Sequence, residues 1–210
     1  VTEAGASYIV MELLEGAPVT DYAEAHRFDV PARLALFTEA CGAIEHAHRN
    51  LVVHSDIKPS NVLATDDFGI KLLDFGIARL LNRSDGADLR AHTPGYGSPA
   101  QRDGLPPSPA DDVHALGALL QALLAGQPVD ADLAAVAARA AATDTKDRYG
   151  AVNELLGEIE RWRAHRPVLA RKAEPLHRLS LYWRRHRVGI SIVLAAFILN
   201  QNGVPSGKTP

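Results

Sequence analysis

Two groups of residues constrain this chain more than any others: the polar stretch from His54 to Asn61 and the tripeptide Asp74-Phe75-Gly76. Between them lie two short apolar runs, residues 62–64 and 70–73, which are typical of strands. They are separated by residues 65–69, where Asp and Gly are the expected residues of a turn. The pattern predicts a β-hairpin that sets an aspartate, a lysine, an amide and a second aspartate at fixed offsets. Such a set suits the magnesium-assisted transfer of a phosphoryl group to a hydroxyl.

The order H-x-D-x-x-x-x-N, followed by D-F-G after a strand, resembles the catalytic core of protein kinases. The dipeptide Lys58-Pro59 resembles their serine/threonine branch. Phosphoryl transfer is catalysed mostly by positioning and by electrostatic stabilisation. The resemblance implies that Asp56 takes the proton of the substrate hydroxyl and that Lys58 neutralises the transferring phosphate. It also implies ATP and Mg²⁺ as cofactors, with Asn61 and Asp74 binding the metal through oxygen, the donor that this ion prefers.

Asp-Phe-Gly occurs twice, and the two copies are expected to differ in role. The first copy, at residues 67–69, falls in the predicted turn of the hairpin. Only the second copy follows a strand and opens a loop, so only Asp74 is assigned to the metal. The alternative is a chance hairpin with surface acids, which the occurrence of all these motifs in order disfavours.

Residues 8–16 predict a strand that ends in Glu and Gly, and they resemble the last strand of the kinase small lobe running into the hinge. The resemblance makes Met11 the gatekeeper beside the adenine pocket. It implies that the backbone C=O of Glu12 and the backbone N–H and C=O of Leu14 bind adenine, while Leu63 forms the apolar floor. An ordinary buried strand is the alternative.

Apolar residues at a spacing of three and four predict amphipathic helices at Pro31–His48 and Ala110–Leu124. Two further helices are expected at Leu133–Ala142 and Val152–Trp162. The run from Asp112 to Gly117 resembles the buried central helix of the kinase large lobe, in which the aspartate holds the catalytic loop through backbone N–H groups. The expected fold class is therefore α+β and mainly α, a protein-kinase-like large lobe with a short β-hairpin, preceded by the hinge strand.

The polar segment between Ile77 and Thr93 follows the second Asp-Phe-Gly and is expected to be an activation segment. Residues 93–99 resemble the end of that segment, where the substrate chain docks, and Thr93 would bridge Asp56 and Lys58. Candidate phosphorylation sites are Ser84, Thr93 and Ser98. Structural support is expected from His54, Phe75, Gly76, Asp112 and Arg148.

Two departures from the kinase pattern concern parts that the sequence lacks. It begins at the hinge strand, without the Gly-rich loop, the strand lysine and the helix glutamate that clamp the nucleotide phosphates. We therefore expect a fragment of a longer kinase or a truncated reading frame that is a poor enzyme by itself. In addition, few residues separate Gly126 from the helix expected near Asp130, where the family usually has an extra docking helix.

Two further departures replace one residue each. Ser55 stands where an arginine usually pairs with a phosphate on the activation loop. Ala100 replaces the glutamate that in the family pairs with the arginine matching Arg148. Because an unpaired buried charge is costly, Arg148 must find water or another acid, such as Asp147 or Asp103, or weaken the fold.

Charge is unevenly distributed along the chain, although the total is only −3. Residues 1–160 carry 12 Lys and Arg against 24 Asp and Glu, whereas residues 161–187 carry 9 against one. Residues 188–199 then form an uncharged apolar run.

Basic residues and aromatics beside such a run indicate the cytoplasmic edge of a membrane segment. Nucleic-acid binding is the rival interpretation, but the larger acidic region would oppose it. A run of twelve residues is short for a span, so either a spanning helix is cut off or the run lies in the interface.

The single cysteine, Cys41, lies on the apolar face of the first predicted helix and excludes an internal disulfide. His46 and His48, at the end of that helix, are expected to pack or to cap it. We expect a cytoplasmic kinase region, associated with the membrane through its C-terminal segment and acting on protein substrates. The competing hypothesis is a catalytically inactive pseudokinase or scaffold. The expected regions are the last small-lobe strand and hinge (1–16), the large lobe (17–166), a basic juxtamembrane linker (167–187), the apolar segment (188–199) and a polar tail (200–210).

Overall fold

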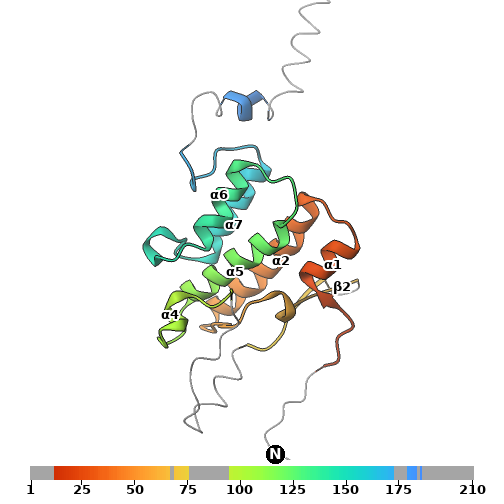
Figure 1. Cartoon of the computed structure of the whole chain (residues 1–210), viewed down its shortest axis with the longest axis vertical. Helices are drawn as coiled ribbons and strands as arrows, with labels where there is room; N and C mark the ends of the chain where they lie inside the picture. The colour runs from red at the N-terminus through yellow and green to blue at the C-terminus, as the bar shows by residue number, and fades with distance from the viewer. Residues whose placement is uncertain (1–11, 67–68, 76–94, 173–178, 184, 186–210) are drawn as a thin grey trace, which may run out of the picture.

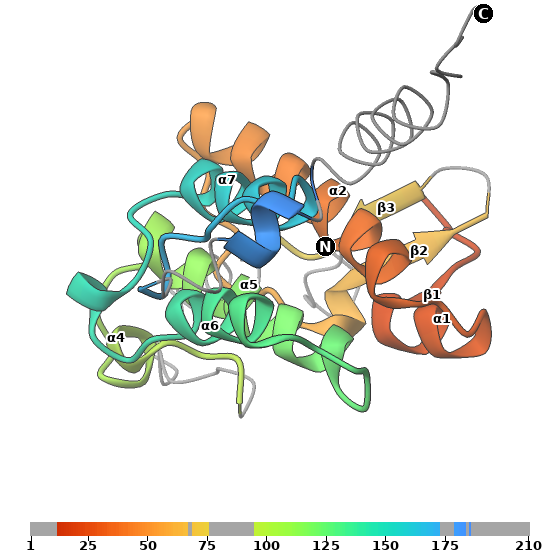
Figure 2. The same cartoon turned by 90° about the horizontal axis from the view of Figure 1, so that it is seen from above.

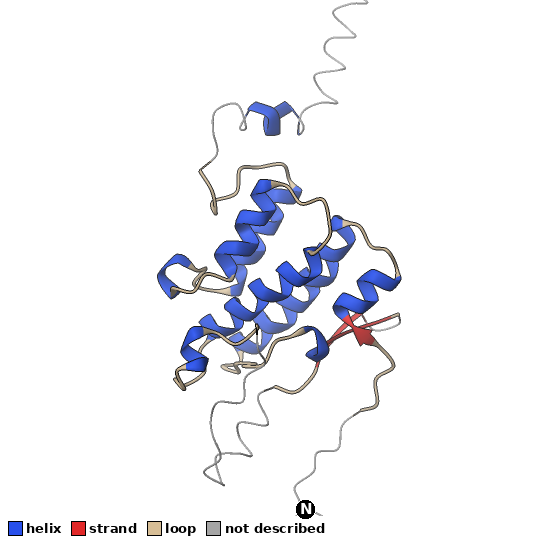
Figure 3. Cartoon of the chain, in the orientation of Figure 1, coloured by secondary structure: helices blue, strands red, loops and turns tan. Residues whose placement is uncertain are grey.

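The computed structural model of the chain describes residues 12–66, 69–75, 95–172, 179–183 and 185. Helices make up most of this part, and a small sheet lies at one end (Figure 3). In chain order the elements are β1 (Ala17–Pro18), α1 (Val19–Ala25), α2 (Val30–Arg49), the 3₁₀ turn η1 (Pro59–Asn61), β2 (Val62–Thr65), β3 (Gly69–Leu72), α4 (Pro99–Arg102), α5 (Pro109–Leu124), α6 (Ala131–Ala140), the 3₁₀ turn η2 (Thr145–Asp147) and α7 (Val152–Arg163) (Figure 1).

The core lies between α2 and α5, which run side by side, and α6 and α7 pack against this pair (Figures 1 and 2). The side chain of Asp29 caps α2 by accepting a hydrogen bond from the N–H of Ala32 at 3.0 Å, and a proline occupies the first turn. Phe37 from α2 and Leu116 from α5 are both fully buried. The guanidinium of Arg33 adds a polar link, because it donates to the backbone carbonyl of Leu123 at 2.8 Å.

The three strands form an antiparallel sheet in the order β1-β2-β3. In the hairpin, Val62 lies opposite Leu72 and Thr65 lies opposite Gly69. Gly69 has a φ of +67°, a conformation that favours glycine. The predicted hairpin is therefore confirmed; of the first Asp-Phe-Gly, only Gly69 lies within the described residues, at the start of β3.

Helices α5 and α6 approach each other closely at Gly117. A Cβ atom at this position would lie 2.3 Å from the backbone nitrogen of Ala141, closer than van der Waals contact allows. The absence of a side chain at Gly117 is thus required by the packing of α5 against the end of α6.

Two buried acids, Glu158 on α7 and Asp132 on α6, contact the chain that follows α7. Glu158 on α7 accepts hydrogen bonds from the backbone N–H groups of Leu169 and Ala170, both at 2.7 Å. Arg171 donates to Asp132 on α6 at 3.2 Å. Along the part of the chain that the structure describes, no helix has both the length and the apolar character needed to cross a membrane. The apolar run 188–199 lies outside the described residues.

All four predicted helices are present, with bounds that differ by one or two residues at most ends. The mainly helical α+β architecture is likewise confirmed. The strand predicted for residues 8–16 is wrong for its described part, because residues 12–16 are irregular. The rest of that prediction lies outside the described residues. Helix α1 and strand β1 were not predicted from the sequence.

Candidate catalytic site

The polar stretch of residues 54–61, called the catalytic loop below, is held to the core by Asp112. This aspartate is buried at the start of α5. Its carboxylate accepts hydrogen bonds from the backbone N–H groups of His54 and Ser55, both at 2.8 Å. The ring of His48, at the end of α2, hydrogen-bonds the same carboxylate through Nε2, also at 2.8 Å. Three groups from two segments thus satisfy one buried carboxylate, which fixes the loop relative to α2 and α5.

Asp56, Lys58 and Asn61 converge on one point at the surface of this loop. The Nζ atom of Lys58 lies 2.7 Å from Oδ2 of Asp56, and the two side chains are 23% and 35% exposed. The amide nitrogen of Asn61 donates both to that Oδ2 and to the backbone carbonyl of Asp56, each at 2.9 Å. The carboxylate is therefore oriented by a charged donor and a buried amide, while it remains accessible to solvent.

The hairpin brings Asp74 to the same end of the sheet as Asn61. Since Val62 pairs with Leu72, the residues just outside this pair lie next to each other, and the N–H of Leu73 donates to the carbonyl of Asn61 at 2.9 Å. Asp74 follows directly, exposed and with a φ of +55°. This left-handed conformation is uncommon for a residue other than glycine and turns the chain sharply as it leaves the strand.

His54 and Phe75 connect the loop with the segment after the hairpin. Their ring centroids are 4.6 Å apart with the planes tilted by 39°. His54 is fully buried, and its burial lowers the pKa of the imidazole, although the negative charges of Asp112 and Asp56 act in the opposite direction.

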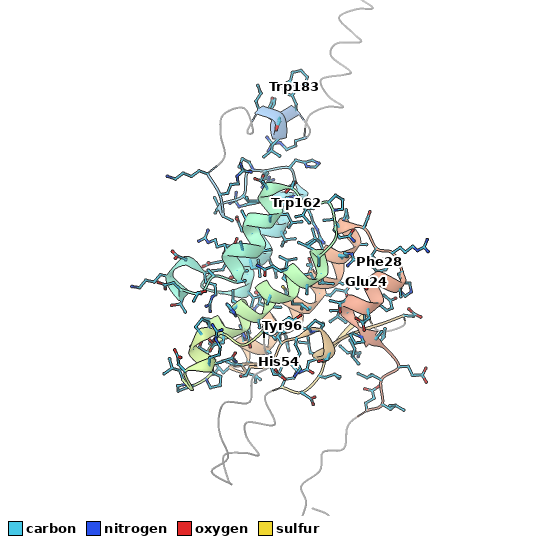
Figure 4. All side chains as sticks on the ribbon, in the orientation of Figure 1. Glu24, Phe28, His54, Tyr96, Trp162 and Trp183 are labelled. Atoms are coloured by element: carbon cyan, nitrogen blue, oxygen red, sulfur yellow. The ribbon has the colours of Figure 1, made fainter. Side chains whose placement is uncertain are left out.

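The segment that follows residue 94 is joined to the loop through Ser98 and Gln101. Ser98 is fully buried and caps the short helix α4; its hydroxyl donates to Asp111, and its Oγ accepts from the N–H of Gln101 at 3.1 Å. The side chain of Gln101 reaches the catalytic loop, where Nε2 donates to the carbonyl of Ser55 at 2.8 Å. In Figure 4, His54 and Tyr96 lie toward one end of the lobe and Trp162 toward the other.

The burial of Ser98 corrects one prediction, because a hydroxyl that caps a helix and is closed off from solvent is not open to phosphorylation in this arrangement. The other candidate phosphorylation sites, Ser84 and Thr93, lie outside the described residues, and so does Gly76.

Arg148 was expected to find water or an acid such as Asp147 or Asp103, or else to weaken the fold, and its partners are different. It is buried and donates instead to the backbone carbonyls of Ala110 at 2.6 Å, Ala142 at 2.8 and 3.0 Å, and Thr143 at 3.2 Å. Burial lowers the pKa of its guanidinium, and Asp111 and Asp144 oppose this effect. The planar fork of five N–H donors lets arginine satisfy several carbonyls at once.

The residues proposed for adenine lie partly within the described chain. Glu12 is exposed, Leu14 and Leu63 are half-buried, and Met11 lies outside the described residues. Gly16 passes against the backbone of β2, where an added Cβ would lie 2.9 Å from the carbonyl oxygen of Ala64. The segment proposed as the hinge thus enters the lobe beside the strand that carries Leu63.

Two contacts of this site were not found from the sequence. His48 was expected only to pack or to cap, yet it bonds Asp112 across 64 positions of the chain. Gln101 was not considered, although its position three residues after Ser98 fits a capping box, which is a signal that sequence reasoning can use. Its second contact, with Ser55, depends on the tertiary structure.

Among the described residues, no cluster of three or more His, Cys, Asp or Glu side chains is arranged to hold a metal ion. A site with fewer protein ligands fits the residues present. The amide nitrogen of Asn61 is directed at Asp56, so its oxygen is the atom left for a cation, and the exposed carboxylate of Asp74 lies at the same end of the hairpin. Magnesium commonly takes one or two protein oxygens and completes its shell with phosphate and water.

A comparison with family models matches residues 1–157 to the protein kinase domain. This chain belongs to the protein kinase family. The match covers the described large lobe from α1 into α7, including the catalytic-loop stretch and the hairpin.

Among curated proteins, the kinase chain is 28% identical over 197 residues to the serine/threonine-protein kinase PknB of Mycobacterium leprae, covering 79% of this chain and 32% of that protein. It is 32% identical over 120 residues to the SNF1-related protein kinase catalytic subunit alpha KIN12 of Arabidopsis thaliana, covering 57% and 24%. The chain thus spans about a quarter to a third of the length of these relatives.

Among solved structures, the kinase domain of Mycobacterium tuberculosis PknI is similar to this kinase chain with a TM-score of 0.55 and 28% sequence identity. The similarity covers 72% of this chain and 64% of that one. These similarities agree with membership of the protein kinase family and confirm the kinase-like fold.

Proposed function

We propose that this chain is the large lobe of a serine/threonine protein kinase that transfers the γ-phosphoryl group of ATP to a Ser or Thr hydroxyl of a protein. The observation that carries the proposal is the environment of Asp56, whose Oδ2 lies 2.7 Å from Lys58 Nζ and 2.9 Å from Asn61 Nδ2. Two donors on one oxygen orient the carboxylate, and partial exposure lets a substrate reach it. A base positioned in this way contributes about 10²–10⁴ in rate.

The residues of the site have distinct roles in this proposal. Asp56 accepts the hydrogen bond of the substrate hydroxyl and takes its proton. The ammonium of Lys58 stabilises negative charge that develops beside Asp56 in the transition state. The backbone of residues 54–55, held by Asp112, keeps both groups in place.

Magnesium and ATP are proposed as the cofactors. The amide oxygen of Asn61 and the carboxylate of Asp74 would hold the metal, and Glu12, Leu14, Met11 and Leu63 would contact adenine. When bound, the nucleotide supplies the phosphoryl group and the metal neutralises part of its charge. The chain's own contribution is to orient the acceptor and to hold cationic and carboxylate groups at fixed positions.

Transfer of labelled phosphate from ATP to a generic protein substrate tests this proposal. The full-length protein that contains residues 1–210 is compared with Asp56→Asn, which keeps the shape of the side chain and removes the base. We expect labelling by the wild type and a loss of about a hundredfold or more in the variant. Asp66→Asn, at the hairpin turn, is a control for the removal of an acid. Equal labelling by the wild type and Asp56→Asn would rule out the kinase proposal.

The competing function is a pseudokinase or scaffold that binds protein without catalysis. The presence of Asp56, Lys58, Asn61 and Asp74 in one constellation favours the enzyme. Binding of nucleotide with no transfer by the full-length protein would favour the scaffold instead.

Membrane association through residues 161–199 is a second proposal, which concerns location rather than chemistry. In the described part of this region, residues 179–183 are helical and expose Leu179, Tyr182 and Trp183 by 51–54%. Basic residues near an anionic leaflet contribute about 1 kcal/mol each. At low salt, the full chain should sediment together with phosphatidylserine vesicles. Equal sedimentation with purely zwitterionic vesicles, or none with either, would refute the electrostatic anchor.

A further inference from the structure

The side chain of Gln101 is a buried amide that uses both of its ends. It is 6% exposed. Its oxygen accepts from the N–H of Ser98 at 3.0 Å and closes the capping box of α4, while its nitrogen donates to the carbonyl of Ser55 at 2.8 Å. The cap requires only the oxygen, since Glu and Gln serve equally well at this position of a capping box. The nitrogen therefore makes a separate contact, between segments that are 46 residues apart.

Ser55 is the residue directly before Asp56, and its backbone is held in an uncommon conformation. Its φ is +70°, in the left-handed region that L-residues other than Asn, Asp and Gly rarely adopt. Such a conformation persists only where the surroundings determine it. Here Asp112 accepts from the N–H of Ser55 at 2.8 Å, and Gln101 donates to its carbonyl. The backbone N–H and the backbone carbonyl of Ser55 are thus held by side chains from two different helices, α5 and α4.

The carbonyl that Gln101 contacts belongs to the peptide group shared with Asp56. Because a peptide group is planar, fixing the Ser55 carbonyl also fixes the direction of the Asp56 N–H and the position of the Asp56 Cα. That N–H points toward Nδ1 of His54 at 3.3 Å. The direction in which the Asp56 carboxylate leaves the backbone is therefore linked to α4.

We propose that Gln101 is a positioning residue that orients the peptide group between Ser55 and Asp56, and thereby the carboxylate of Asp56. The contact joins the catalytic loop to α4, which begins at the end of the segment 93–99, where the acceptor chain is expected to dock. Ser55, Asp56, Tyr96 and Gln101 line a common cavity of about 10 Å³ at this junction. The inference rests on the proposed kinase function and adds a residue to it.

Gln101→Glu separates the two contacts of this side chain. A glutamate keeps an oxygen for the N–H of Ser98, so the cap of α4 remains. It replaces the donor with a second acceptor that faces the carbonyl of Ser55, so that contact is lost. Gln121→Glu, on the exposed side of α5, is the matched control for the added negative charge. Gln101→Met removes both the donor and the cap acceptor without adding charge, and it serves as the second variant if the glutamate destabilises the fold.

Two measurements on the full-length protein test the proposal. The first is the NMR chemical shift of the Ser55 carbonyl carbon, which should move in both Gln101 variants and stay unchanged in Gln121→Glu. The second is steady-state kinetics, where kcat should fall at least about tenfold with the KM for ATP unchanged, since misplacing a reacting group by about 1 Å costs about a hundredfold. A purely structural role would lower the melting temperature and the active fraction without this contact-specific shift.

The outcomes separate this proposal from the kinase proposal. An unchanged Ser55 shift in folded Gln101 variants, or a moved shift with kcat unchanged, would overturn the positioning role. Absence of phosphoryl transfer in the wild type would instead overturn the kinase proposal, and a catalytic role for Gln101 with it. In that case the Ser55 shift would still show whether the contact exists.

Discussion

At the scale of single residues, buried polar groups decide how this lobe is held together. Asp112, Arg148 and Gln101 are each less than 7% exposed, and each bonds to backbone groups of a segment distant in the sequence. Burying such groups is costly unless their hydrogen bonds are made. Each of them therefore specifies which segments pack together and does not add a large net stability.

The guanidinium of Arg148 bonds three backbone carbonyls, and its replacement tests how much these contacts stabilise the fold. Arg148→Lys keeps the charge but replaces five fixed donors with three on a single nitrogen, so part of the bonding to Ala110, Ala142 and Thr143 is lost. We expect the free energy of unfolding to fall by about 1–3 kcal/mol. Urea denaturation measures this, with the exposed Arg163→Lys as control. A loss for Arg148→Lys no greater than that of the control would show that the carbonyl contacts contribute nothing measurable.

At the scale of elements, the site depends on how closely α5 packs on its neighbours. Helix α5 carries Asp112 at its first turn, and α6 fixes its middle through the close approach at Gly117. The hairpin adds Asp74, which comes just after β3 and well before α5 in the chain. A shift of α5 would therefore move the anchor of the catalytic loop.

Two glycine substitutions separate packing from helix propensity. Gly117→Ala would place Cβ 2.3 Å from the nitrogen of Ala141 and 2.5 Å from the carbonyl carbon of Ala140, so backbone must move. We expect a loss of about 3 kcal/mol, at the upper end for overpacking. Gly157→Ala, on α7 with no atom within 4 Å of its Cβ, should stabilise by about 0.5–1 kcal/mol. Thermal unfolding of both variants measures the difference, and equal effects of the same sign would contradict the packing at Gly117.

At the scale of the whole molecule, the acidic lobe and the basic segment after it are joined through Glu158. This buried carboxylate receives two backbone N–H groups from residues 169–170, next to the ion pair of Arg171 with Asp132. The exit of the basic segment from the lobe is therefore structured and not a loose linker at this point.

Glu158→Ala should release this junction. Without the carboxylate, the N–H groups of Leu169 and Ala170 lose their acceptor, so their amide hydrogen exchange should become at least about tenfold faster, because local opening is no longer opposed. Glu160→Ala, on the exposed side of the same helix, is the control. Unchanged exchange at both amides in Glu158→Ala would show that other contacts hold the junction.

The sequence by itself determined the kinase resemblance, the hairpin and the four long helices, because these follow from local spacing: a period of 3.6 for helices, short apolar runs for strands, and Asp and Gly at turns. It also placed Asp56, Lys58 and Asn61 within one loop, where proximity along the chain makes proximity in space nearly unavoidable. Only the tertiary structure decided the partners of Arg148, the burial of Ser98 and the contacts of His48 and Gln101. Those bonds join residues that lie up to 64 positions apart, and no local pattern encodes which distant backbone group will face a buried side chain.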